Sequence, residues 1–99
     1  MYSEKIQSII KHYRDDNLVI IETMGVVDNY NDLQPCHTII RFHDNDIDEL
    51  LHILETFKNS FIVFDNFSFW IKDYDYNQIS DFYRKLSHLS RKINSIICM

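Results

Sequence analysis

The stretch NLVIIETMGVV, residues 17–27, constrains the fold more than any other part of the sequence. It is rich in β-branched residues and apolar on both alternating faces, which favours a strand in the interior of a sheet. Residues 36–43, CHTIIRFH, alternate between two faces and predict a second strand. A polar connector at 28–35 separates the two segments, so the simplest arrangement is an antiparallel hairpin.

Three further segments carry apolar residues at helical spacing. The first two cover residues 2–14 and about 46–58. The third follows Asp75, which forms a capping box with Gln78, and its apolar stripe continues to Ile97. We therefore expect three amphipathic helices, of which the last is the longest.

The segment NSFIVFDNFSFWIK, residues 59–72, predicts a third strand, or a tight hairpin turning at Asp65 and Asn66. Its second half alternates between apolar and polar residues, which favours continued strand structure. The order α-β-β-α-β-α predicts an α+β fold, with helices packed on a small antiparallel sheet of three to four strands.

Length and composition exclude several classes of protein. A chain of 99 residues predicts a single domain over 1–99, because two halves would each lack a sufficient core. One glycine and one proline leave no glycine-rich loop to cradle a phosphate, and no apolar run approaches the ~20 residues of a membrane span. Two isolated cysteines and an N-terminus without signal-peptide features indicate a soluble, cytoplasmic protein.

The stretch DNDIDELLHILE, residues 44–55, has the carboxylate spacing of a calcium-binding EF-hand loop but predicts a helix instead. The sixth position of such a loop requires glycine, and here it is Glu49. A helical apolar period also runs through the whole stretch. We expect Asp44 or Asn45 to cap a helix whose first turn holds the remaining acids, Asp46, Asp48 and Glu49.

No other motif predicts catalysis, a metal or a cofactor. The five histidines show no HExxH or His-x-His spacing, and the chain contains no CxxC and no GxSxG. We therefore predict a protein that is not an enzyme, with no metal site and no cofactor.

Charge is distributed unevenly along the chain, which carries a formal net charge of −5. Residues 15–55 hold ten acidic side chains against one basic side chain, Arg41. If these acids converge in space, their field repels nucleic acid and attracts a basic protein; alternatively, they solvate loops and cap helices. A basic stripe on the last helix, from Arg84 to Lys92, is more typical of a solvated face than of a nucleic-acid site in so acidic a chain.

Large aromatic residues near acids are typical of protein-binding surfaces, where the rings supply affinity and the charges supply steering. Trp70 shares a predicted strand face with Ser68 and Lys72, and Tyr74 and Tyr76 follow among aspartates. A helix that covered this face would bury Trp70 instead. We predict that the partner-binding residues are Asp44, Asp46, Asp48, Glu49, Trp70, Tyr74 and Tyr76.

These observations predict a small acidic inhibitor that binds and occludes a basic nucleic-acid-handling enzyme such as a nuclease. The chain resembles immunity proteins, antitoxins and phage counter-defence proteins such as anti-CRISPRs in size and charge alone. Such a role involves no direct contact with nucleic acid and no membrane. The alternative is a non-catalytic interaction subunit or adaptor, which could be a homodimer paired through an open sheet edge.

Overall fold

The computed structural model of the protein describes residues 4–13, 16–23, 33–44 and 46–99. Residues 24–27 of the first predicted strand lie outside this description. The elements, in chain order, are α1 (Glu4–His12), β1 (Leu18–Glu22), β2 (Thr38–Arg41), α2 (Ile47–Leu54), β3 (Phe61–Asp65), α3 (Phe67–Ile71), α4 (Tyr76–Lys92) and β4 (Ile96–Cys98).

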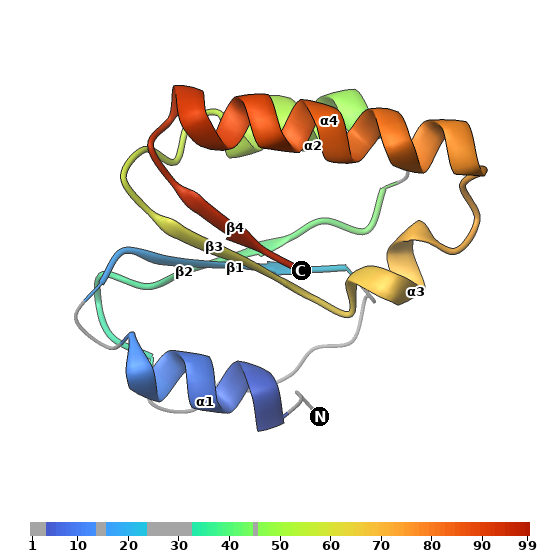
Figure 1. Ribbon diagram of the computed structural model, residues 1–99. Coiled ribbons are helices and arrows are strands. Elements are labelled where there is room, and N and C mark those ends of the chain that lie inside the picture. Colours follow the sequence, from blue (N-terminus) through green and yellow to red (C-terminus); the bar gives the residue numbers. More distant parts are fainter. Residues whose placement is uncertain (1–3, 14–15, 24–32, 45) are drawn as a thin grey trace.

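The four strands form one parallel sheet in the order β2-β1-β3-β4 (Figure 1). The predicted antiparallel hairpin and the antiparallel α+β sheet are therefore wrong, and the arrangement is α/β. Parallel neighbours need a connection of about a dozen residues or more to return the chain to the same end of the sheet. The segment between Glu22 and Thr38 is long enough to do so, and helices connect the remaining strands.

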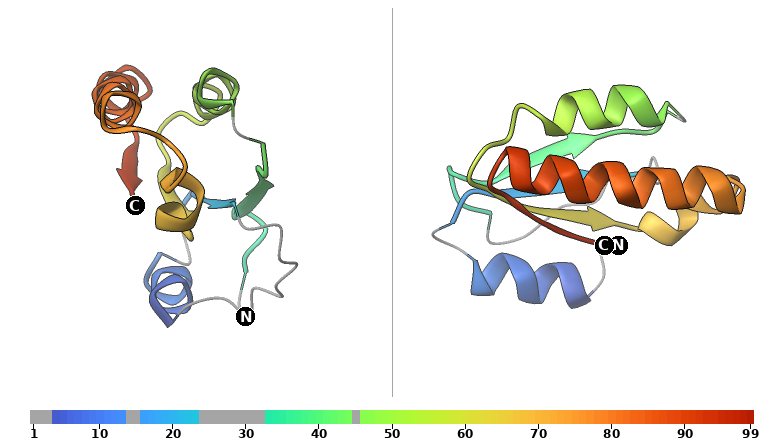
Figure 2. Two further views of the ribbon diagram at one scale, coloured as in Figure 1. Left: turned by 90° about the vertical axis from the view of Figure 1, so that its right-hand side faces the viewer. Right: turned by 45° about the horizontal axis from the view of Figure 1, so that its top comes forward.

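Helices cover both faces of the sheet, which explains why β1 is apolar on both faces (Figure 2). All five residues of β1 are buried, because the strand has a neighbour on each edge and a hydrophobic cluster on each face. Alternate strand residues pack under α2 and α4 on one face and against α1 on the other. Interior strands of parallel sheets carry such continuous apolar runs.

The second half of the predicted third strand is the short helix α3, and the strand prediction for residues 67–72 is wrong. Phe67, Trp70 and Ile71 recur at helical spacing, and the first two are buried. Short apolar runs of this kind fit the period of a helix as well as that of a strand.

The last helix is shorter than predicted. It ends at Lys92, and Asn94 then adopts a left-handed conformation with φ 53° that allows the chain to turn. The final apolar residues of the predicted stripe, which include Ile97, belong to β4 instead.

The structure also identifies the residues that begin α2 and α4. Asp46 caps α2 by accepting a hydrogen bond from the backbone N–H of Glu49 (3.1 Å), and the predicted cap Asp44 is therefore wrong. Asn45, the other predicted cap, lies outside the described residues. The capping box predicted for Asp75 and Gln78 is confirmed in both of its hydrogen bonds. The acids at the start of α2 therefore have a structural role at a helix N-terminus.

Candidate functional site

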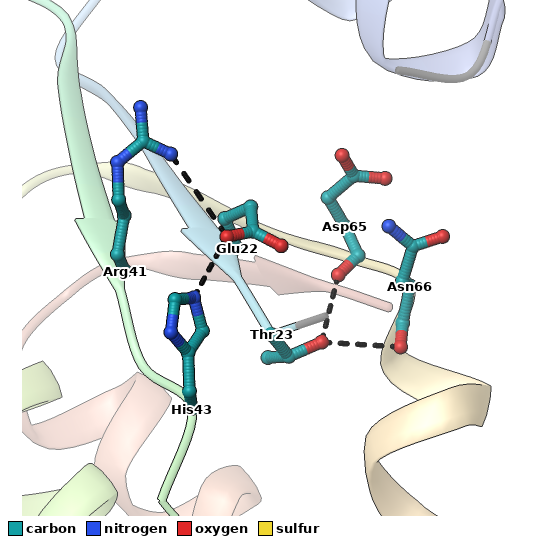
Figure 3. Close-up of polar contacts among 6 residues, drawn as sticks. All are labelled: Glu22, Thr23, Arg41, His43, Asp65 and Asn66. Atoms are coloured by element: carbon teal, nitrogen blue, oxygen red, sulfur yellow. Dashed lines mark hydrogen bonds and ion pairs between the residues drawn. The ribbon is translucent and has the colours of Figure 1, made fainter. Parts of the chain in front are cut away.

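The carboxyl ends of the parallel strands bring together polar residues from three segments (Figure 3). The chain passes from β1 to β2 on one side and from β3 to β4 on the other, so its direction reverses between β1 and β3. In open parallel sheets, ligands bind beside this topological switch point. Glu22 and Asp65 are register partners there, and both are buried.

Glu22 is the centre of a charged network that fixes the end of β2. Its side chain is 1% exposed, and Oε2 lies 2.9 Å from His43 Nε2 and 3.9 Å from Arg41 Nη1. A buried carboxylate needs such partners, because the loss of its hydration is costly. The backbone N–H of Phe42 also donates to the Glu22 carbonyl (2.8 Å). The network thus positions the chain immediately before Asp44.

Thr23 supports the neighbouring turn that leads from β3 into α3. Its hydroxyl group donates a hydrogen bond that two carbonyl oxygens share, that of Asp65 (3.0 Å) and that of Asn66 (3.1 Å) (Figure 3). Asn66 has φ 63°, a left-handed conformation that asparagine tolerates better than most residues. This turn and the Glu22 network together give the carboxyl end of the sheet a defined shape.

Chemically, a carboxylate paired with an imidazole can hold or transfer a proton. Cys36, whose thiol could serve as a nucleophile, is not part of this pair. It lies at the opposite end of the sheet, where its thiol donates to the Asp16 carbonyl (3.3 Å). The direct effect of the Glu22–His43 contact is therefore to hold β2 against β1.

Beside this network, the loops after β2 and after α3 surround Tyr74 with aspartates. Burial is the main cause that raises the pKa of Tyr74, and the charges of Asp44, Asp46 and Asp73 raise this pKa further. Tyr76 follows and is 82% exposed. We call Asp44, Asp46, Asp73, Tyr74 and Tyr76 the acidic aromatic surface.

Trp70 belongs to the core beneath this surface. It is 5% exposed, its ring centre lies 5.5 Å from those of Tyr74 and Phe82, and its indole Nε1–H donates to the Asp44 carbonyl (2.8 Å). The ring therefore supports both Tyr74 and the loop that carries Asp44. Trp70 is buried, as the alternative to an exposed anchor required, but it lies on α3 and not on a strand covered by a helix.

The remaining acids of α2 lie beside the basic stripe of α4. Asp48 lies 3.7 Å from Lys85, which also lies 3.0 Å from Asp81, and Glu55 pairs with Lys92. Hydrogen bonds from these lysines lower the pKa values of Glu55 and Asp81, and Asp81 in turn raises the pKa of Lys85. These ion pairs thus partly neutralise the acidic charge that the middle of the sequence contributes to α2.

The structure brings together some of the predicted partner-binding residues. Asp46, Asp48 and Tyr74 line one hollow, and Trp70 links Tyr74 to the carbonyl of Asp44. Glu49 lies on the exposed side of α2. Sequence analysis missed Glu22 and Asp65, the acids that end the apolar runs VIIE and FIVFD. Parallel strands bring such ends together, but an antiparallel hairpin does not, so the wrong topology concealed the signal.

No protein-family model matches the chain, and comparisons with curated proteins and with solved structures found no match either. Among the described residues, no group of three or more histidine, cysteine, aspartate or glutamate side chains is arranged to hold a metal ion. The helices in the described segments are too short or too polar to cross a bilayer.

Proposed function

We propose that this protein is a small, non-catalytic inhibitor that binds a basic nucleic-acid-handling enzyme through the acidic aromatic surface and occludes its phosphate-binding groove. In this role the protein would be an immunity protein, an antitoxin or a phage counter-defence protein such as an anti-CRISPR. The observation that supports the proposal most directly is that two loops far apart in sequence meet at Tyr74. Asp46 lines a hollow together with Tyr74, and Trp70 contacts the Tyr74 ring while it binds the carbonyl of Asp44.

The electrostatics of this surface favour a basic partner. Aspartates on one side of a domain with net charge −5 produce a negative field that accelerates encounter with a positive groove. The same field disfavours nucleic acid itself, which would compete for the groove of the partner. The inhibitor would thus occupy the place of a phosphate backbone.

Shape and rigidity also support binding at this position. A hollow of about 400 Å³ lies between α2 and the first half of α4, and Ile47, Tyr74 and Gln78 contribute to its lining. Among the described residues, the same lining holds three carboxylates, those of Asp46, Asp48 and Asp81, against one basic side chain, Lys85, which pairs with Asp48 and Asp81. Apolar Ile47 and the tyrosine ring can pack on the aliphatic part of a lysine or arginine side chain, whose charge the aspartates attract. Trp70 holds the loop from below, so little order must be gained on binding.

A non-catalytic adaptor or homodimer is the second candidate, and the open edge of β4 favours it. Ile96 is 64% exposed on this edge, and Tyr83, which is 44% exposed, lines a hollow of about 190 Å³ with Ile97 and Met99. Apolar surface beside an unpaired strand can pair with another chain.

The decisive experiment compares two variants of equal charge. Asp44→Asn/Asp73→Asn removes two charges from the acidic aromatic surface, and Asp16→Asn/Glu55→Gln removes two charges at the opposite end of the sheet. Basic enzymes captured from an extract of the native host are purified, and their nuclease or nucleic-acid-binding activity is titrated with each protein. We expect the first variant to inhibit at least about tenfold less well than the wild type, and the second to inhibit within about twofold.

Inhibition should weaken steeply with added salt, and nucleic acid should compete with the inhibitor. Equal inhibition by the two variants would contradict the proposed surface. The protein could instead associate only with itself, through a contact that is insensitive to salt and that Ile96→Lys abolishes. This result would contradict the inhibitor and support the homodimer.

A further inference from the structure

An open pocket of about 430 Å³ lies at the amino end of the sheet, the end opposite to the acidic aromatic surface. The short turns that precede β1, β3 and β4 meet there and contribute residues 16–17, 59–60 and 94. Tyr13 from the end of α1 and Ile96 from the start of β4 complete its lining together with Phe61. The volume is within the range of small-molecule sites.

Hydrogen bonds between the turns hold the polar lining in place. Asn59 and Asn94 both have φ 53°, and Asn94 Nδ2 donates to Asn59 Oδ1 (2.8 Å). The backbone N–H of Asn59 donates to the Ile93 carbonyl (2.9 Å), and that of Ser60 donates to the buried Ser95 hydroxyl (2.9 Å). A ligand would therefore meet amide groups whose backbone is already fixed.

The same pocket offers apolar surface. The ring of Tyr13 stacks on that of Phe61, with centres 4.2 Å apart and planes 22° from parallel. Ile96 leaves 64% of its surface exposed beside them. A ligand with an apolar face would cover these groups, at a gain of about 25 cal/mol for each Å² of apolar surface that it removes from water.

The charge of the lining restricts the ligand. Among the described residues that line the pocket, Asp16 is the single charged one, and the others are amides, a serine and side chains with apolar or aromatic surface. An anionic ligand would meet this carboxylate, and none of the described lining residues is basic. Amides and hydroxyls, by contrast, both donate and accept hydrogen bonds, as do the hydroxyl groups of a sugar.

We propose that this pocket binds a neutral ring compound rich in hydroxyl groups, namely the sugar ring of a free saccharide or of an uncharged nucleoside. The amides of Asn59 and Asn94 bind the hydroxyls, Asp16 accepts from them, and the apolar face of the ring lies against Ile96. Because the pocket and the acidic aromatic surface are at opposite ends of the sheet, both can be occupied at once.

Titration of the isotope-labelled protein with D-glucose, D-ribose, adenosine and AMP, followed by amide NMR shifts, tests this proposal. We expect saturable shifts at residues 16–17, 59–60 and 94–96. Saturation by glucose or ribose identifies a saccharide site, and saturation by adenosine alone identifies a nucleoside site; either supports the proposal. AMP should bind more weakly than adenosine, because its phosphate meets Asp16. No saturable shift with any probe, or tighter binding of AMP, would overturn the proposal.

A matched pair of variants separates binding from folding. Asn94→Gly removes the amide but keeps the left-handed backbone, which glycine adopts without strain, and should weaken binding about tenfold. Asn66→Gly makes the same change at the carboxyl end of the sheet, where φ is 63°, and should leave affinity within about twofold. Ile96→Ser, at an exposed position, should also weaken binding. Equal effects of the two glycine variants would contradict the proposal, whereas Asp44→Asn/Asp73→Asn tests the inhibitor surface alone.

Discussion

Trp70 joins the hydrophobic core to the loop that carries Asp44. Most of its ring packs against Phe42, Phe67 and Phe82, while its Nε1–H donates to the Asp44 carbonyl (2.8 Å). A buried indole usually places its N–H on such a partner, because an unmade hydrogen bond is costly. The residue therefore acts on the acidic aromatic surface from below.

Trp70→Phe should destabilise the protein, because it removes this hydrogen bond and leaves part of the indole volume empty. We expect the free energy of unfolding in urea to fall by about 1–3 kcal/mol. Tyr76→Phe is the control, because Tyr76 is 82% exposed, and it should change the free energy by less than about 0.5 kcal/mol. A Trp70→Phe protein as stable as the wild type would show that Trp70 does not support the loop.

At the scale of elements, length decided which of them could be predicted. α1, α2 and α4 were recognised because each repeats an apolar stripe over at least two turns. α3 has five residues and β4 has three, and segments this short do not distinguish the period of a helix from that of a strand. The chain turns at Asn66, at the start of α3, and at Asn94, before β4, and both residues adopt left-handed conformations. Asparagine tolerates this conformation but does not require it, so the residue type alone did not predict these turns.

The ion pairs that Glu55 and Asp81 form with lysines of α4 should make stability depend on acid pH. The folded protein lowers the pKa values of Glu55 and Asp81 below 4.5 and 3.8, their ordinary values. Their stabilisation is therefore present above those ordinary values and is lost as pH falls through the lowered ones, since the unfolded chain then binds more protons. Between about pH 6 and about pH 3, Glu55→Gln/Asp81→Asn should lose less stability in urea than the wild type.

Glu49→Gln provides the comparison for this measurement, because Glu49 lies on α2 but is in neither of these pairs. The loss of stability over this pH range should therefore be larger for Glu49→Gln than for Glu55→Gln/Asp81→Asn. Added salt should reduce the difference between the variants, because both pairs are solvent-exposed and screened. Identical pH profiles for all three proteins at low salt would contradict a stabilising role for the pairs.

For the whole molecule, strand direction was the feature that local patterns did not determine. The apolar run in β1 indicated an interior strand, and burial on both faces is typical of parallel sheets, but the polar connector suggested a hairpin. Direction depends on how each connection crosses the sheet, which periodicity does not report. Neither the proximity of Asp46 to Tyr74 nor the pairing of Glu22 with His43 could be predicted, because each depends on which strands end at the same side of the sheet.

The parallel order β2-β1-β3-β4 makes a specific prediction for amide hydrogen exchange. Strands β1 and β3 have neighbours on both sides, so every amide in residues 19–21 and 62–64 is bonded within the sheet and buried. These amides should exchange slowest, near the rate of global unfolding. In the edge strands β2 and β4, protection should alternate, because every second amide faces away from the sheet. Exchange followed by NMR can measure both patterns. Continuous protection along β4 would reveal another chain on that edge and favour the homodimer, and alternating protection in β1 would contradict its central position.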